Sequence, residues 1–335
     1  VTFYMPVWNE SVTYAYLLEK IRKARVQDVP FAHVQINDFF HEDDFKAITA
    51  SPEIKLAPQS SDSDLFNALF KSGYKIIEFP GCITDKDVYL NWHQHKRSDH
   101  RYNNTSCEGF GVTLRLLQPK SAAIQKLTEF LNSEEFRTAI AEKFGIPMDE
   151  VFYDAGIQKY LDGYEISPHP DIRKKALTYM VNINSDPQSK KNEHHTHYLQ
   201  FKDSHKYVQS YWEGNPDSDR CWVPWSWCET KKIQNENNSI VIFSPANNTL
   251  HGVKARYDHL KYQRTQLYGN FWYNEACTTK HPAWESFVIE QTGKRKAATI
   301  KGRISTILPK GAKTFVKDVL LKSRRDVASG RLKRD

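Results

Sequence analysis

The chain has 335 residues, of which 39% are hydrophobic and 13% aromatic, with 14 Gly and 15 Pro, and this composition excludes general disorder. No apolar run approaches the roughly 20 residues that cross a bilayer, and the N-terminus lacks a signal-peptide pattern, so we expect no membrane span. The five cysteines are scattered and form no C-x-x-C pair, which indicates a reduced, cytoplasmic protein.

The N-terminal part of the sequence has mainly helical patterns. We predict an N-terminal helical segment within 1–28, with the helix itself at 10–25, and an extended stretch at 33–36. The acidic run at 41–44 is typical of a helix start. Further predicted helices cover 62–71, 84–96, 121–131 and 133–144.

From about residue 150 the pattern changes to short β-rich runs separated by turn residues. The predicted strands are 151–161, 176–184, 197–201, 221–227, 239–243 and 264–273. Many short strands after a helical half indicate an α+β fold with a mainly β core, a sandwich or barrel flanked by N-terminal helices. We place this domain at 29–290 and its β core at about 150–275.

The formal net charge of +7 is concentrated at the C-terminus. Residues 293–335 contain 14 Lys/Arg and three Asp, a net of +11, so the other 292 residues carry −4. Such tails contact nucleic acid or anionic lipid in some proteins, but a solvated appendage is the more common case. We predict a basic tail over 291–335, with an amphipathic helix at 312–325, and do not expect nucleic acid as a partner.

His169 and Asp171 stand two residues apart, 80 residues before His251, and the strand-like run that starts at Arg264 follows 13 residues later. Two imidazoles and one carboxylate on one face of an ion suit non-haem Fe(II), because they leave positions open for a co-substrate and O₂. A dicarboxylate co-substrate would need a fixed guanidinium such as Arg264. A second H-x-D match, His41 to Asp43, lies at a predicted helix start, where acidic residues have a capping role.

The sequence from 150 to 273 resembles the catalytic domain of prolyl-4-hydroxylase-type Fe(II)/2-oxoglutarate oxygenases. The resemblance is carried by Gln158-Lys159-Tyr160, Gly163, Pro168-His169-Pro170-Asp171, Leu177-Thr178 and Val181-Asn182-Ile183-Asn184. The stretch from Pro30-Phe31-Ala32-His33 to Phe39-Phe40 is similar to the usual entry into such domains.

This resemblance implies a double-stranded β-helix, or jelly-roll, in which His169, Asp171 and His251 hold Fe(II). It further implies that Arg264 binds the C5 carboxylate of 2-oxoglutarate and that Tyr160 lines the co-substrate pocket. The spacing from His251 to Arg264 is longer than is common in the family, which leaves Arg256 as a rival for the carboxylate.

The implied reaction hydroxylates an unactivated C–H bond and converts 2-oxoglutarate and O₂ to succinate and CO₂. The substrate, a small molecule or a peptidyl residue, and the oligomeric state stay open. The alternative is a catalytically degenerate jelly-roll that binds nucleic acid or membrane through the basic tail. A degenerate domain would be expected to lose a metal ligand, and none of the three is lost.

Other candidate residues have plainer explanations. His194, His195 and His197 are interpreted as a polar loop entering a strand, since no Cys or carboxylate stands at zinc-site spacing. Three tryptophans at 222, 225 and 227 favour core packing over a wall of the substrate pocket, with 211–212 expected on a loop. Arg173 fits a surface role as well as a substrate contact.

Overall fold

The computed structural model describes residues 14–95, 106–215, 218 and 221–275. The chain divides into two units, Val1–Thr278 and Thr279–Asp335, and every described residue belongs to the first. The predicted basic tail and its predicted helix at 312–325 therefore lie outside the described residues.

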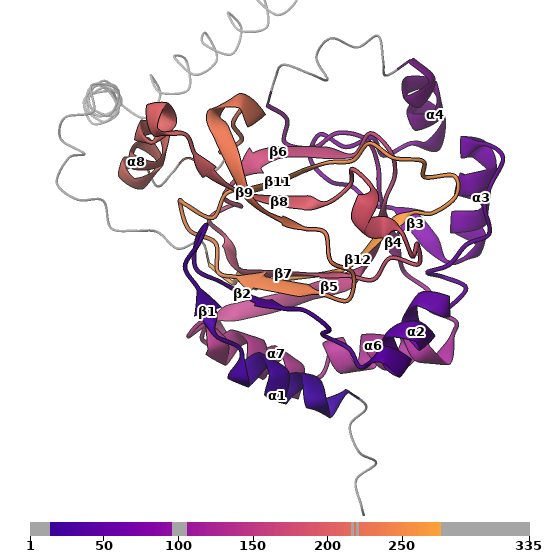
Figure 1. Cartoon of the computed structure of the whole chain (residues 1–335), viewed down its shortest axis with the longest axis horizontal. Coiled ribbons are helices and arrows are strands. Elements are labelled where there is room, and N and C mark those ends of the chain that lie inside the picture. The colour runs from indigo at the N-terminus through magenta and orange to yellow at the C-terminus, as the bar shows by residue number, and fades with distance from the viewer. Residues whose placement is uncertain (1–13, 96–105, 216–217, 219–220, 276–335) are drawn as a thin grey trace, which may run out of the picture. The chain divides into compact units, whose positions relative to one another are not determined.

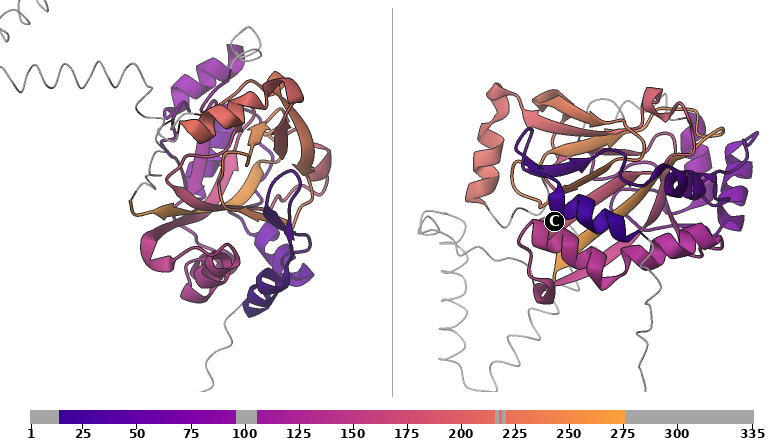
Figure 2. Two further views of the ribbon diagram at one scale, coloured as in Figure 1. Left: turned by 90° about the vertical axis from the view of Figure 1, so that its left-hand side faces the viewer. Right: turned by 60° about the horizontal axis from the view of Figure 1, so that its bottom comes forward.

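Two antiparallel sheets form the centre of the first unit, stacked one above the other in Figures 1 and 2. The larger sheet has eight strands, in the order β1 (Val26–Gln27), β2 (His33–Ile36), β10 (Ile240–Phe243), β7 (Lys175–Asn182), β12 (Arg264–Tyr273), β5 (Val151–Tyr160), β4 (Thr113–Leu116) and β3 (Tyr74–Ile76). The smaller sheet has four, in the order β6 (Glu165–His169), β11 (His251–Lys254), β8 (Thr196–Phe201) and β9 (Cys228–Gln234).

Helices cover the face of the larger sheet that points away from the smaller one (Figures 1 and 2). These are α1 (Ala15–Lys23), α2 (Glu42–Ala50), α6 (Ala122–Leu131) and α7 (Glu134–Lys143). Next to β3 and β4 lie α3 (Asp62–Lys71) and α4 (Lys86–His95), and α8 (Tyr207–Gly214) lies beside the smaller sheet. In the part of the chain that the structure describes, no helix combines the length and apolar character needed to span a membrane.

Successive side chains of a strand point to opposite faces of its sheet. In the larger sheet one face packs in the hydrophobic core and the other borders a cavity between the two sheets. Along β12, Leu267 and Phe271 are buried in the main core, beneath the helices. The alternate residues Arg264, Gln266 and Tyr268 point the other way and line the cavity. One strand thus supplies both the packing that holds the helices and the side chains of the candidate site.

The predicted mixture of N-terminal helices and antiparallel β structure is confirmed, and the predicted bounds of β2, α3 and β12 agree with the structure. The strand predicted at 221–227 is wrong, because Pro224 lacks an N–H for a ladder and a 3-10 turn, Trp225–Trp227, follows it. Strand β9 begins only at Cys228, which pairs with Phe201. The loop predicted at 211–212 is also wrong, since Val208 and Trp212, four residues apart, bury one face of helix α8.

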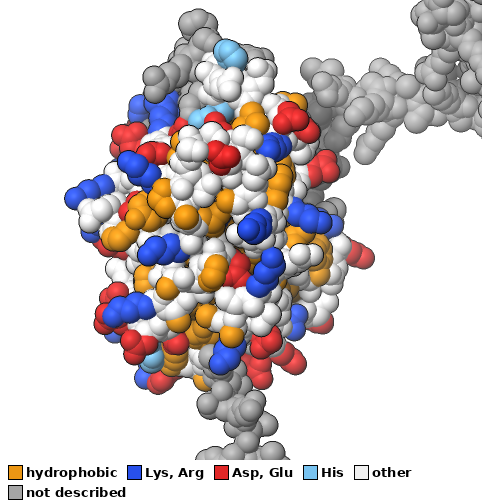
Figure 3. Space-filling view, turned by 90° about the vertical axis from the view of Figure 1, so that its right-hand side faces the viewer, with side chains coloured by type: hydrophobic (Ala, Val, Ile, Leu, Met, Phe, Trp, Pro, Cys, Tyr) orange, Lys and Arg blue, Asp and Glu red, His pale blue; other side chains and the backbone are white. Residues whose placement is uncertain are grey.

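The face of the first unit in Figure 3 has described Lys and Arg side chains interspersed with Asp and Glu. Opposite charges so distributed are typical of a solvated surface. The four cysteines among the described residues, Cys82, Cys107, Cys221 and Cys228, are free thiols.

Candidate metal centre

The three predicted metal ligands lie together where two strands of the smaller sheet meet. His169 ends β6, His251 begins β11, and the two residues pair directly across the ladder. Asp171 has a left-handed φ of 72°, and its Oδ1 lies 3.5 Å from His169 Nε2 and 3.8 Å from His251 Nε2. One ligand atom from each side chain lies within 4.8 Å of the other two, so the three converge on one point.

Backbone carbonyls determine which nitrogen each ring presents. His169 Nδ1 lies 2.9 Å from the carbonyl oxygen of Ser167, and His251 Nδ1 lies 3.0 Å from that of Thr249. A carbonyl oxygen only accepts, so each Nδ1 carries a proton and donates it, and each Nε2 of a neutral ring keeps its lone pair. Burial, together with the neighbouring His169, lowers the pKa of His251 to about 3 and keeps that ring neutral.

The Asp171 carboxylate is held by two buried donors. Its Oδ1 accepts from Lys175 Nζ at 2.8 Å, and its Oδ2 accepts from the Thr178 hydroxyl at 2.8 Å. Burial opposes ionisation, but the Lys175 ammonium holds the pKa of Asp171 well below its usual range. Burial likewise works against the charge of Lys175, but the ion pair with Asp171 raises its pKa above the ordinary value.

Two imidazoles and one carboxylate on one side of a common point form the donor set that non-haem Fe(II) takes, with further positions left for small ligands. All three side chains are buried and held by hydrogen bonds to the backbone or to neighbouring side chains, as ligands with a fixed second shell are. The residues present therefore fit the ion that the sequence predicts.

A cavity of about 420 Å³ between the two sheets is lined by all three ligand side chains and by the predicted co-substrate residues Tyr160 and Arg264. Trp222 also lines it, and its ring stacks on that of His169 with the centroids 5.8 Å apart. Trp222 is therefore part of the cavity wall and not of the predicted core packing. Trp225 and Trp227 do pack on a small core beside α8, as predicted.

Arg264 is a buried cation, 2% exposed, at the start of β12. Its Nη2 donates to the Thr196 hydroxyl at 3.0 Å, and its guanidinium carbon lies 4.6 Å from the centroid of the Tyr160 ring. Burial lowers the pKa of Arg264, and the titratable groups around it include the phenols of Tyr160, Tyr164, Tyr198 and Tyr257. No carboxylate among the described residues forms an ion pair with it, so a bound anion would supply the missing counter-charge.

The rival arginine lies elsewhere. Arg256 is exposed, and its backbone N–H donates to the carbonyl of Glu193 at an isolated bridge. Arg264, and not Arg256, is among the residues that line the cavity. The position of the two side chains therefore favours Arg264 as the anion-binding residue.

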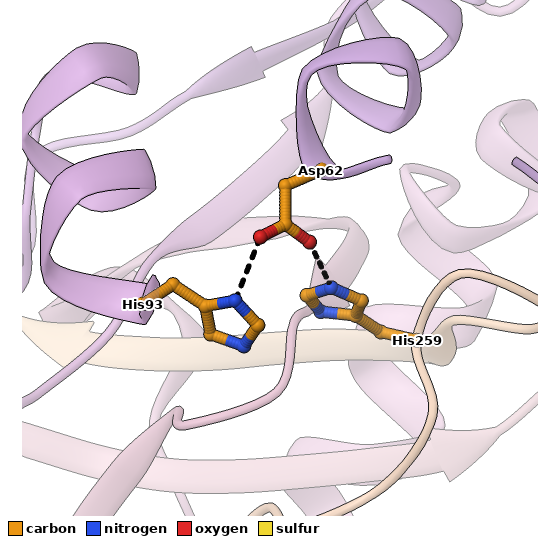
Figure 4. A group of neighbouring side chains, drawn as sticks. All are labelled: Asp62, His93 and His259. Carbon is orange, nitrogen blue, oxygen red and sulfur yellow. Dashed lines mark hydrogen bonds and ion pairs between the residues drawn. The ribbon is translucent and has the colours of Figure 1, made fainter. Parts of the chain in front are cut away.

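A second group of titratable side chains, Asp62, His93 and His259, lies outside this cavity (Figure 4). Asp62 Oδ2 is 2.7 Å from His93 Nδ1, and its Oδ1 is 2.7 Å from His259 Nε2. The backbone N–H of Asp162 donates to His259 Nδ1 at 2.8 Å, so the neutral ring carries its proton on Nε2 and donates it to Asp62. His93 Nε2 faces Asp162 Oδ2 at 3.0 Å. This group therefore joins α3, α4 and two loops by hydrogen bonds rather than presenting lone pairs to a metal.

The other histidines and Arg173 do not enter the candidate site. His194 and His195 are buried, whereas His197 Nδ1 lies 3.0 Å from the Thr230 hydroxyl, and the three do not form a ligand group among the described residues. Arg173 donates to the carbonyl of Trp212 at 2.8 Å and so contacts α8. His41 directly precedes α2, so the second H-x-D match lies at a helix start as predicted, with Asp43 in the first turn and no capping hydrogen bond from the His41 side chain.

The sequence missed two features of the site region. Lys175 stands next to Asp171 in space, and the only sequence signal for it is a charged residue at the edge of the apolar run 176–181. The hydrogen-bonded group in Figure 4 joins residues at 62, 93 and 259, and no local motif links positions so far apart.

No protein-family model matches the chain, and no curated protein matches it. It is similar to the solved structure of a prolyl-4-hydroxylase from Pseudomonas putida, with a TM-score of 0.38 and 10% identity over 78% of this chain and 100% of that one. A prolyl hydroxylase from Trichoplax adhaerens, solved with a hypoxia inducible factor peptide, gives a TM-score of 0.37 and 10% identity over 78% and 89% of the two chains.

The epimerase SnoN, solved with Fe³⁺, alpha ketoglutarate and nogalamycin RO, gives a TM-score of 0.38 and 10% identity over 79% of this chain and 88% of that one. The first two of these structures are prolyl hydroxylases, the enzyme type that the sequence resemblance named, and the third is an epimerase that holds iron and alpha ketoglutarate. At such scores and identities the similarity indicates nothing about the chemistry of this chain.

Proposed function

We propose that the chain is an Fe(II)- and 2-oxoglutarate-dependent dioxygenase in which His169, Asp171 and His251 hold the iron. The observation that carries the proposal is one shared cavity. Three converging ligand atoms and a buried guanidinium with no carboxylate partner among the described residues line the same 420 Å³ space. Bound iron, with 2-oxoglutarate and O₂, would supply oxidation of an unactivated C–H bond, with release of succinate and CO₂.

The chain's own residues would set the geometry for this chemistry. Arg264 and the Thr196 hydroxyl, 3.0 Å apart, would bind the C5 carboxylate of the co-substrate. Tyr160 would keep the guanidinium in place, since its ring lies against it. The carbonyls of Ser167 and Thr249 would hold the two imidazoles in the tautomer that a metal needs.

The two stacked antiparallel sheets also support the proposal of a jelly-roll fold. In that arrangement the smaller sheet contributes the two histidine ligands, and the larger sheet contributes Arg264 and Tyr160 from the paired strands β12 and β5. The space between the sheets would then exclude water from the reacting groups. The substrate would be a small organic molecule or a peptidyl side chain that reaches this space.

Anaerobic titration of the protein with Fe(II) and 2-oxoglutarate tests the proposal. A visible metal-to-ligand charge-transfer band is expected in the wild type, because a keto acid chelated to Fe(II) absorbs in the visible range. His169→Ala should abolish the band, whereas His259→Gln should retain it. Absence of the band in the wild type with both ligands in excess would contradict the proposed function.

A further inference from the structure

Lys175 points into the cavity because a β-bulge lies next to it. Opposite β12, Leu177 pairs with Phe271 and Lys175 pairs with Trp272, so β7 has one residue more than its partner at this point. Bulges re-aim a side chain and are frequent beside active sites. In a regular strand, residues two apart point to the same face. Here Leu177 lies in the core under the helices, whereas Lys175 lines the cavity on the other face of the sheet.

The position of the Lys175 ammonium would be unfavourable once a metal ion is bound, if the group served only to pair with Asp171. It is 2.8 Å from Asp171 Oδ1, the same oxygen that faces both histidine Nε2 atoms. An iron ion held by His169, Asp171 and His251 would share this oxygen with the cation and be repelled by it. The Thr178 hydroxyl satisfies Asp171 Oδ2 and the metal would satisfy Oδ1, so the carboxylate would need no further donor from Lys175.

Lys175 and Tyr268 together present two donors to the cavity. Lys175 Nζ donates to the Tyr268 hydroxyl oxygen at 2.8 Å, and both residues line the cavity. An ammonium group has three N–H donors, and Asp171 and Tyr268 accept two of them. The third N–H of Lys175 and the phenolic proton of Tyr268 are therefore both left for another acceptor, and the two oxygens of a carboxylate would accept one each.

The net charge of the occupied cavity also favours binding of an anion. With a divalent ion and the dianionic co-substrate bound, the charges of Asp171, Lys175 and Arg264 leave one net positive charge in the inner cavity. The other charged lining residues do not cancel it there. Arg115 pairs with Asp154 at 2.9 Å, and Glu78 is exposed and screened by solvent. Glu108, half-buried, also lines the cavity but has no ion pair with Lys175.

We propose that Lys175, with the Tyr268 hydroxyl, binds a carboxylate group of the organic substrate next to the metal, so that the enzyme acts on a carboxylate-bearing compound. This inference rests on the proposed function, because the cavity is shared with the metal and the co-substrate. The rings of Tyr268 and Trp272, whose centroids lie 5.5 Å and 5.4 Å from Lys175 Nζ, would border the substrate's apolar part.

The test uses the full chain loaded with Mn(II), a paramagnetic and redox-inactive substitute for Fe(II), and saturating 2-oxoglutarate, which occupies Arg264. Benzoate, the isosteric neutral benzamide and the cationic benzylamine are the probes. Mn(II)-enhanced relaxation of the probe protons reports binding near the metal. We expect benzoate to bind at least about tenfold more tightly than benzamide, as hydrogen bonds to a charged group require, and benzylamine to bind most weakly.

Variants identify the responsible group. Lys175→Met should abolish the preference for benzoate, and Lys175→Arg should retain it. Lys174→Met is the matched control, because Lys174 is exposed, adjacent in sequence and over the Phe152 ring rather than in the cavity. It removes the same charge and should behave as the wild type.

Two results would overturn the inference while leaving the proposed function intact. One is equal binding of benzoate and benzamide by a protein that binds Mn(II) and 2-oxoglutarate normally. The other is weaker 2-oxoglutarate binding in Lys175→Met with unchanged probe preference, which would assign Lys175 to the co-substrate. Failure of the wild type to bind Mn(II) and 2-oxoglutarate would overturn the proposed function, and this inference with it.

Discussion

His169 and His251 lie directly opposite each other on neighbouring antiparallel strands, and each ring donates its Nδ1 proton to the carbonyl two residues before it. The same local hydrogen bond therefore prepares both ligands, although 82 positions separate them in the sequence. Asp171 Oδ1 faces the two Nε2 atoms and completes the set of three donors for a metal.

Replacing His251 should remove metal binding, whereas replacing His259 should not. We expect His251→Ala to lower the Mn(II) affinity by more than about 100-fold, since even partners behind a ligand change affinity by about 10–100-fold. His259→Gln should leave the affinity near that of the wild type and lower thermal stability, because it breaks the hydrogen bonds to Asp62 and Asp162. Calorimetric titration and a melting curve measure the two effects, and equal losses of metal affinity would refute the assignment.

Thr178 should tune the metal centre through Asp171. Its hydroxyl donates to Asp171 Oδ2 at 2.8 Å, so Thr178→Val leaves that oxygen without its donor. We expect the Mn(II) affinity to fall by about 10–100-fold. Thr128→Val, which removes a hydroxyl bonded to a helix carbonyl on α6, is the control and should leave the affinity unchanged. Equal affinities in the two variants would show that the Thr178 contact is not used.

Arg264 should determine the affinity for 2-oxoglutarate. Removing one partner of a buried charge pair costs about 2–5 kcal/mol, so Arg264→Met should weaken binding at least about 30-fold. Arg256→Met, which neutralises the exposed rival, should bind as the wild type does. Titration of the Mn(II)-loaded protein with 2-oxoglutarate gives both constants. Weaker 2-oxoglutarate binding by Arg256→Met than by Arg264→Met would instead assign the carboxylate to Arg256.

Lys159 should make stability depend on pH. It is fully buried, its Nζ donates to the Ile54 carbonyl and the Thr265 hydroxyl, and burial lowers its pKa to about 7. A lysine in the unfolded chain has a pKa of about 10.4. Between the two pKa values the unfolded chain therefore binds more protons than the folded protein, and the free energy of unfolding rises with pH.

The rise from Lys159 amounts to at most about 1.4 kcal/mol per pH unit, and it is absent below the folded pKa. Lys159→Met should therefore flatten the increase in stability between about pH 7.5 and about pH 9.5. Urea unfolding of both proteins at the two pH values measures the difference in slope. Identical slopes would mean that Lys159 stays charged in the folded state.

The parts of the fold that repeat locally could be predicted from the sequence. The apolar patterns that predicted 62–71 and 264–273 are local signals, and α3 and β12 have these bounds. The helix predicted at 10–25 ends earlier than expected, since α1 ends at Lys23 and Ala24 already has extended backbone. The short strands β3, β4, β6 and β11 have three to five residues and are set by their partners in the sheet. Their own residues give too few periods to be distinguished from loops.

The candidate ligands could be found from the sequence because their order and spacing resemble a known pattern. Lys175 could not, since its direction depends on a bulge that only the pairing of β7 with β12 defines. The Asp62, His93 and His259 group likewise depends on the packing of α3 and α4 against two loops. Contacts between distant positions with no shared motif require the folded structure.

Crystals grown with Mn(II) and 2-oxoglutarate would show whether His169, Asp171 and His251 form the metal site. An anomalous-difference map measured near the manganese edge locates the ion without reference to activity. We expect a peak within bonding distance of His169 Nε2, Asp171 Oδ1 and His251 Nε2, and none at Asp62, His93 and His259. A peak at the second group, or no peak at the first, would contradict this assignment.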